Sequence, residues 1–351
     1  MKHIIYLLTL LPAFGQAQRL YIAPGAQLVV NNAPSLVLNN VSLVNNGSFA
    51  AGNSTVVFTG TSRLYIGGDN PTAFYTLTVH APSNEVQLNT NTFVTNRMAM
   101  DSGNLQLNTY TLNLGATGFI SGERNGARIT GTDGGAIVAT ALLNAPHAVN
   151  PGNTGVEITS DANLGTTTVT RTHRQQSNNS GQTGIQRYFD IVPSYNSAAP
   201  VTLRFYYFDD ELAGNTKNTL SLFSGTPGQD NWAARGKDNS DDINNWILKS
   251  NVPVSQRFTL AVATDSRITG SSMLVYPNPS RDAFTVRLFS EKEKDLVVRL
   301  QSQWGQILET KTIHCQAGNN TIEWNISKYA AGTYLLVFEG NDVQHTKIVK
   351  Q

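Results

Sequence analysis

A repeat of short apolar runs and asparagine pairs occupies the first part of this 351-residue chain. The segment from Leu20 to Ser62 contains no charged residue, although Asn, Ser, Thr and Gly are frequent in it. Its polar groups must therefore be satisfied by hydrogen bonds rather than by solvated charges. Three runs of this kind occupy residues 28–32, 36–40 and 43–47. Because Asn tolerates the left-handed backbone conformation required at corners, the pattern predicts short strands joined by tight turns.

The repeat continues more loosely, for example in residues 56–58, 77–79, 105–108 and 112–115, without a helical period. Repeated strand and corner units are typical of a β-solenoid, in which each coil buries its apolar side chains against neighbouring coils. We expect coils of about 20 residues, with Asn side chains at equivalent corners bonded along the stack. An irregular β-sandwich would have the same composition and is the alternative. Both interpretations are all-β.

Charge and hydropathy exclude two classes of protein. The chain has 25 Lys and Arg against 24 Asp and Glu, a net charge of +1. This balance gives no electrostatic footprint for nucleic acid. No apolar run reaches the roughly 18 residues that a membrane-spanning helix requires.

The first residues have the pattern of a signal peptide. Lys2 and His3 precede an uncharged apolar stretch, 4–14, and residues 15–17 place small side chains at the positions that a signal peptidase reads. We expect a signal peptide over residues 1–17, cleaved between Ala17 and Gln18. A membrane anchor is the alternative, but eleven helical residues extend only about 16 Å. Since there is one cysteine, Cys315, no internal disulfide forms, and we expect this thiol to be buried as a small apolar residue.

Two further modules follow the repeat region, which we assign to residues 18–165. Residues 166–265 contain alternating, aromatic-rich runs separated by Gly-, Pro- and Asn-rich turns, the pattern of a β-sandwich. A polar linker is expected over 266–272. Residues 273–351 hold 17 of the chain's 49 charges, 9 Lys or Arg and 8 Asp or Glu, and six or seven predicted strands. They predict a small, separate immunoglobulin-like sandwich.

This last module resembles the type A C-terminal sorting domain of type IX (Por) secretion-system cargo. The resemblance begins at residues 275–280, continues through 304–306 and 317–320, and closes with 329–335 and 347–351. Trp304 is a departure, because the family commonly has a small or polar residue before the glycine. The sorting motif comprises Tyr276, Pro277, Asn278, Pro279, Gly305, Gly332, Tyr334, Lys347 and Lys350.

The resemblance implies export through the periplasm and across the outer membrane of a diderm bacterium. It also implies two protein partners, the type IX secretion machinery and the sortase that removes the sorting domain. The rest of the protein is then either attached to surface lipopolysaccharide or released. From the residues themselves, Pro277 and Pro279 hold the first segment extended, and Gly332 fits a close approach into a central strand. The chain end at Lys350 and Gln351 is expected to be basic and accessible.

Residues 19–262 resemble, more loosely, the repetitive adhesin-like passengers that accompany such sorting domains. The resemblance lies in 55–60 with 73–79, and in 187–191 with 203–207. It implies a secreted or cell-surface structural protein, with a glycan or another cell-surface ligand. The candidates for stacking on sugars are Tyr206, Phe208, Trp232 and Trp246, with the sandwich core as the alternative place for these rings.

The competing function is a polysaccharide lyase or hydrolase on a β-helix scaffold. It would need carboxylates that converge across coils, and the acids of this region are Asp69, Glu85, Asp101, Glu123 and Asp133, all isolated in sequence. We find no esterase, phosphate-loop or zinc motif, and we expect His147 and His173 to lie at the surface or at corners. No cofactor is therefore predicted apart from a calcium candidate at Asp238, Ser240 and Asp242, where Lys249 stands in the position of an EF-hand glutamate.

Overall fold

The computed structural model describes residues 18–30, 34–177, 183–195, 200–227, 229, 232–262, 274–290, 293–316, 318–339 and 344–351. The fold is all-β, as predicted, and its described helical elements are three short 3₁₀ turns. The chain divides after Val262 into two compact units. The predicted signal peptide and the predicted linker, 266–272, lie outside the described residues.

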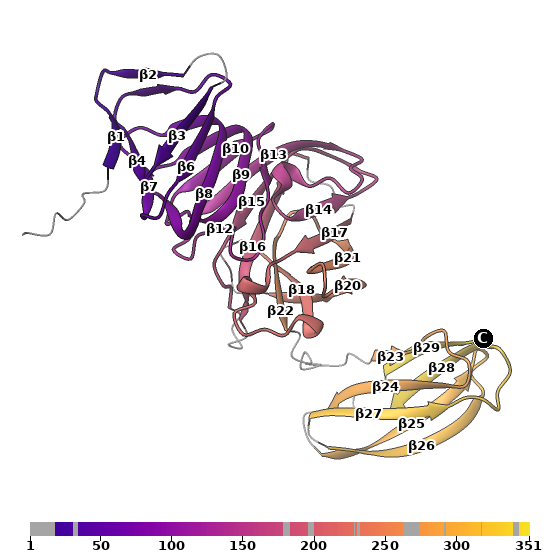
Figure 1. Cartoon of the computed structure of the whole chain (residues 1–351). Coiled ribbons are helices and arrows are strands. Elements are labelled where there is room, and N and C mark those ends of the chain that lie inside the picture. The colour runs from indigo at the N-terminus through magenta and orange to yellow at the C-terminus, as the bar shows by residue number, and fades with distance from the viewer. Residues whose placement is uncertain are drawn as a thin grey trace, which may run out of the picture. The chain divides into compact units, whose positions relative to one another are not determined.

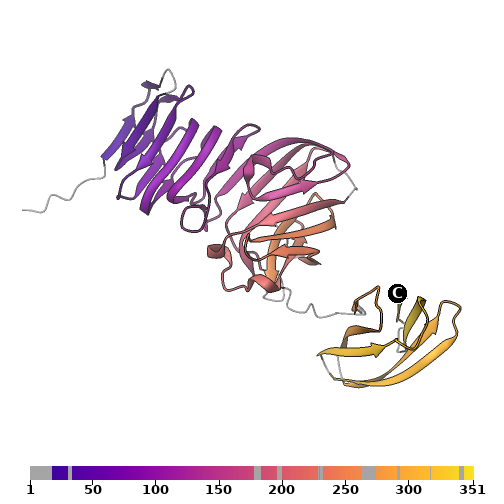
Figure 2. The same ribbon diagram turned by 45° about the vertical axis from the view of Figure 1, so that its right-hand side comes forward.

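The first unit begins with a β-solenoid of about six turns (Figure 1). Its strands are β1 (Gln18–Ile22), β2 (Gln27–Val29), β3 (Ser35–Asn39), β4 (Val41–Asn45), β5 (Ser48–Ala50), β6 (Thr55–Thr59), β7 (Leu64–Gly67), β8 (Thr72–Leu88), β9 (Thr92–Gln106), β10 (Thr111–Gly115), β11 (Phe119–Ser121), β12 (Ile129–Thr130) and β13 (Ala136–Asn144). These strands pair in parallel from coil to coil, which Figure 2 shows as a row of stacked ribbons.

Each coil has three sides. The long strands β8 and β9 run along all three sides and pair with each other. The first residues of β9 also pair with β10, the middle residues of β8 and β9 pair with β6 and β11, and their last residues pair with β7 and β12. Register partners give the length of a coil: Thr72 pairs with Thr92, 20 residues on, and Leu112 pairs with Ile137, 25 residues on. The expected coil length of about 20 residues lies at the short end of this range.

Asparagines occupy the corners and bond along the stack, as expected. Asn40 has a φ of 56°, and its Oδ1 accepts hydrogen bonds from the backbone N–H groups of Thr61 and Ser62 in the next coil, at 2.8 and 2.9 Å. Asn91 accepts in the same way from the N–H of Thr111, at 2.9 Å. The Asn pairs are spaced more closely in the sequence than one coil is long, so their spacing corresponds to the length of one side of a coil.

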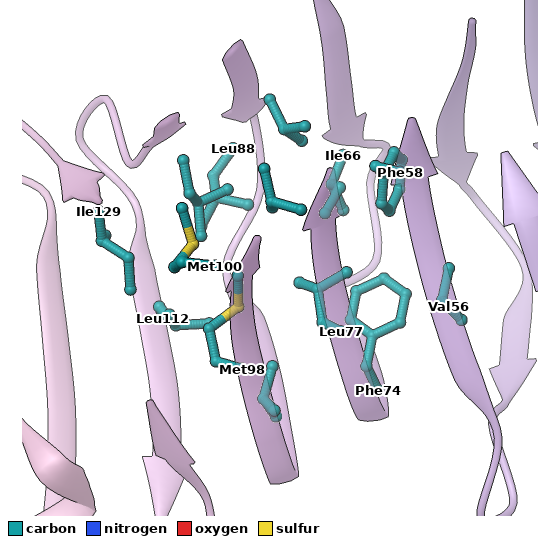
Figure 3. Packing of buried hydrophobic residues seen from close by; sticks show 14 of the residues in the cluster. Val56, Phe58, Ile66, Phe74, Leu77, Leu88, Met98, Met100, Leu112 and Ile129 are labelled. Atoms are coloured by element: carbon teal, nitrogen blue, oxygen red, sulfur yellow. The ribbon is translucent and has the colours of Figure 1, made fainter. Parts of the chain in front are cut away.

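Apolar side chains from all three sides fill the solenoid interior. Phe58 of β6, Phe74 and Leu77 of β8, and Met98 of β9 come from three successive coils and are almost completely buried (Figure 3). Their burial depends on stacking, because a coil has no second layer of its own to cover its apolar face.

The sandwich follows within the same unit. Its elements are η1 (Pro151–Asn153), β14 (Val156–Thr159), β15 (Asn163–Thr172), β16 (Gly184–Pro193), β17 (Val201–Tyr206), η2 (Asp209–Glu211), η3 (Lys217–Thr219), β18 (Leu220–Gly225), β19 (Ala233–Gly236), β20 (Asn239–Asp241), β21 (Trp246–Val252) and β22 (Arg257–Val262). One sheet, β15-β16-β22-β18-β19, is antiparallel and continues the solenoid sheet through β13. The second sheet has the order β14-β17-β21-β20.

Strand β13 belongs to both modules. Its residues Ile137 and Ala139 lie in the solenoid core, whereas Leu143 lies in the sandwich core together with Val156 and Ile158. The sandwich core thus starts upstream of the boundary predicted at residue 165, a position that falls inside β15.

The second unit is a two-sheet sandwich of seven described strands: β23 (Leu274–Tyr276), β24 (Ala283–Ser290), β25 (Lys294–Ser302), β26 (Ile307–Cys315), β27 (Gly318–Asn325), β28 (Gly332–Glu339) and β29 (Gln344–Lys350). The sheets have the orders β23-β24-β27 and β26-β25-β28-β29. Phe284 and Trp324 of the first sheet and Val298 and Leu336 of the second share one core. Cys315 is buried in this core, as predicted.

Candidate functional site

The two ends of the C-terminal unit are joined by hydrogen bonds. Asn278 donates from Nδ2 to the carbonyl of Lys347, at 2.7 Å, and accepts at Oδ1 from the N–H of Val349, at 2.8 Å. Ser280 donates its N–H to the Val349 carbonyl and accepts from the N–H of Gln351, both at 2.9 Å. We call these four bonds the terminal clamp. It brings together the first and last parts of the predicted sorting motif.

Lys350 is buried, although we expected it to be accessible. It is 9% exposed, and its Nζ donates to the carbonyl of Arg281 at 2.7 Å. The expectation of an accessible Lys350 is wrong because side chains alternate along a strand, which places Lys350 on the same inward face as buried Ile348. Lys347 and Gln351 are exposed.

Tyr276, Pro277 and Pro279 are exposed beside the clamp. Gly305 has a φ of +83° in the turn between β25 and β26, next to Trp304, which is 86% exposed. The turn requires a left-handed backbone conformation at residue 305, which glycine adopts readily, and a Cβ there would contact no other atom.

Gly332 and Tyr334 lie on the central strand β28, as expected. A Cβ at Gly332 would meet only the Tyr334 ring, at 4.0 Å, so the close approach expected at this glycine is absent. Tyr334 is 8% exposed and donates its hydroxyl to the carbonyl of Ala330, at 2.6 Å. Its role is therefore to pack and anchor the turn before β28.

The calcium candidate has other partners. The carboxylate of Asp238 accepts from the ammonium of Lys249 and from the N–H and hydroxyl of Ser250. These bonds hold its pKa at about 2, with the Lys249 contact as the largest cause. Ser240 is half-buried and Asp242 is exposed. Within the described part of the chain, no three His, Cys, Asp or Glu side chains form a group that could hold a metal ion.

The four aromatic candidates are half-buried, so they are not core residues. Tyr206 and Trp246 lie opposite each other on β17 and β21. The guanidinium of Arg187 lies 4.9 Å from the centre of the Phe208 ring. Trp232 lies just before β19.

A buried ionic cluster joins the solenoid to the sandwich, and no local sequence pattern indicates it. Glu211 of η2 is fully buried and contacts Arg187 of β16 at 2.8 Å, Arg128 of the solenoid at 3.3 Å and His173 at 3.4 Å. Burial alone would raise the pKa of Glu211, but Arg187, His173 and Arg128 lower it to about 2. The carboxylate is therefore charged at neutral pH.

A second buried pair lies beside it. Arg171 of β15 donates to both oxygens of Glu123, at 2.7 and 2.8 Å, and to the carbonyl of Thr154, at 2.9 Å. The pKa of Glu123 is lowered because Arg171 outweighs burial, which would raise it.

His173 is 1% exposed, so it is not at the surface, which was one of the two positions expected for it, whereas His147 is exposed. Burial lowers the pKa of His173 to about 4, although the Glu211 carboxylate opposes this shift. The imidazole is therefore neutral at neutral pH. These side chains come from segments that are distant in sequence and meet only in the folded chain.

Among the described residues, no helix has the length and apolar character needed to cross a membrane. Comparison with curated proteins and with solved structures gave no match. Residues 274–351 match the family described as "Secretion system C-terminal sorting domain". This match covers both sides of the terminal clamp. The chain is therefore a cargo protein of the type IX secretion system that carries its sorting domain at residues 274–351 and is exported to the cell surface or the extracellular space.

Proposed function

We propose that the part of the chain before the sorting domain is an adhesin-like passenger that is displayed on the outer surface of the cell. The observation that carries this proposal is the combination of a sorting domain with a solenoid that has rows of neutral side chains in register on its outer face. One such row, in register and exposed or half-buried throughout, is Ala73, Phe93, Asn113 and Val138.

A second row supports the same proposal. Tyr65, Gln87, Gln106 and Thr130 are partners in register and point outward from the alternating buried positions. Rows of neutral side chains repeated along a stack suit many weak contacts with a ligand that is itself repetitive, such as a cell-surface glycan. In this proposal the sortase of the secretion machinery removes the sorting domain and attaches the passenger to lipopolysaccharide.

The proposal is tested with cells that possess a type IX system. Cells producing the full chain should bind neutral polysaccharide-coated beads more strongly than cells without it, and protease added outside should remove both the protein and the binding. Equal binding by the two strains would contradict the adhesin role.

The same preparation distinguishes the competing enzyme. The purified protein should retain polysaccharide without releasing reducing ends or unsaturated products. Steady release of either product would replace the adhesin with a hydrolase or a lyase.

A further inference from the structure

We infer that the solvent face of the sheet β14-β17-β21-β20 binds a neutral hexopyranose through Glu157, Arg204, Tyr206 and Trp246, which we call the Trp246 platform. This inference rests on the proposed adhesin function and names the ligand and the residues that bind it.

Strand alternation places the four side chains on one face. Phe205 and Ile247, the neighbours of Tyr206 and Trp246, are buried in the sandwich core, so Tyr206 and Trp246 point the opposite way. Tyr206 pairs in register with Trp246. Arg204, two residues before Tyr206, pairs with Glu157 of β14 and shares this face. The platform therefore spans three neighbouring strands.

Contacts within the platform fix its shape before any ligand arrives. Glu157 accepts from Arg204 Nη1 at 2.9 Å and from the Tyr206 hydroxyl at 2.8 Å. The guanidinium carbon of Arg204 lies 4.8 Å from the centre of the Trp246 ring. Because each side chain is held by another, binding costs little side-chain entropy. The side chains of Arg204 and Glu157 are 35% and 21% exposed to solvent, so a ligand can contact them.

The chemistry of the platform fits a neutral sugar. The C–H face of a pyranose packs on aromatic rings, and its hydroxyls both donate and accept. A carboxylate beside a guanidinium therefore matches two adjacent hydroxyls, one donating to Glu157 and one accepting from Arg204. The charges of Glu157 and Arg204 cancel, and Asp241, opposite Trp246 on the other side, adds a negative charge. This balance disfavours uronic acids and sulfated sugars.

The test measures binding of the full chain to an array of neutral gluco-, manno- and galacto-oligosaccharides and their uronate- or sulfate-bearing counterparts. We expect binding to neutral members, and less than about a twofold change between about 50 and 500 mM NaCl, because salt screens only charged contacts. Trp246→Ala should weaken binding at least about tenfold, and Glu157→Gln should weaken it several-fold. The control is Trp304→Ala, which removes a more exposed tryptophan from the sorting domain.

The possible failures are distinct. Binding that survives both Trp246→Ala and Glu157→Gln, or that is confined to anionic sugars, would overturn the platform while leaving the adhesin function in place. If the unaltered chain bound no glycan, both the adhesin function and the sugar-binding role of the Trp246 platform would be contradicted. Thermal unfolding of each variant checks that it is folded. If Trp246→Ala is unstable, Glu157→Gln still tests the platform, because this change preserves the size of the side chain.

Discussion

Glu211 is the residue on which the junction between solenoid and sandwich most depends. Its carboxylate is fully buried against two arginines and His173. Arg128 also contacts Asp210, at 3.7 Å, but Glu211→Gln leaves the buried Arg187 without its ion-pair partner, so we expect the free energy of unfolding to fall by about 3–5 kcal/mol. Chemical denaturation of the full chain measures this. Glu157→Gln, which disrupts a partly exposed ion pair, should cost only about 0–1 kcal/mol, and similar losses in the two variants would refute the role of Glu211.

The lowered pKa of His173 predicts that the stability of the folded chain depends on pH in the mildly acidic range. Its pKa is lowered to about 4 in the folded chain, from an ordinary value of 6.5. Between these values the unfolded chain binds a proton that the folded chain does not, so stability falls as the pH is lowered from 6.5 toward 4. The slope from this group is at most about 1.4 kcal/mol per pH unit.

His173→Asn should flatten that part of the stability profile, as measured by denaturant midpoints at each pH. His147→Asn removes an exposed histidine and should leave the slope unchanged. The interpretation fails if the two variants have the same profile. At lower pH, Glu211, with a pKa of about 2 against an ordinary 4.5, continues the loss of stability from about pH 4.5 downward.

At the scale of single elements, the corners limit what the solenoid tolerates. Gly60 has a φ of +120°, and a Cβ there would overlap Oδ1 of Asn40, the acceptor of the corner bonds. Gly60→Ala should therefore destabilise the chain by about 2 kcal/mol or more, through backbone strain and lost hydrogen bonds. Gly25→Ala, at a positive φ but in open space, should cost about 1 kcal/mol. Thermal unfolding compares them, and an equal effect would show that the corner contact contributes nothing.

The terminal clamp makes a prediction about strand β29. Asn278→Ala removes both side-chain bonds to this strand, so the amide of Val349 should exchange with solvent markedly faster in hydrogen-exchange measurements. Asn325→Ala removes only local bonds to Ser327 and serves as the control. Unchanged protection of Val349 in Asn278→Ala would mean that the clamp does not hold the end of the strand.

Local patterns predicted the elements better than their assembly. Asn pairs identified the corners because the need for a left-handed conformation is a property of one residue. They could not show that three sides make a coil, which depends on pairing between coils. The partners Arg128 and Glu211 are 83 residues apart, and no local period links them. Alternation predicted β17 and β21, but whether Tyr206 and Trp246 face the core depends on which face the second sheet covers.

For the whole molecule, the central claim is that residues 274–351 direct the export of everything before them. The two parts are separate compact units with separate cores, so removing the second should leave the first folded. A chain ending at Val262 should then be made and folded but remain inside the cell envelope.

The most direct measurement is the amount of protein outside cells with an intact type IX system, compared between the full chain and the chain ending at Val262. Both are normalised to the protein retained within the cells. We predict that the full chain appears on the surface or in the medium and that the shortened, folded chain is retained. Equal amounts of the two outside the cells would contradict the account.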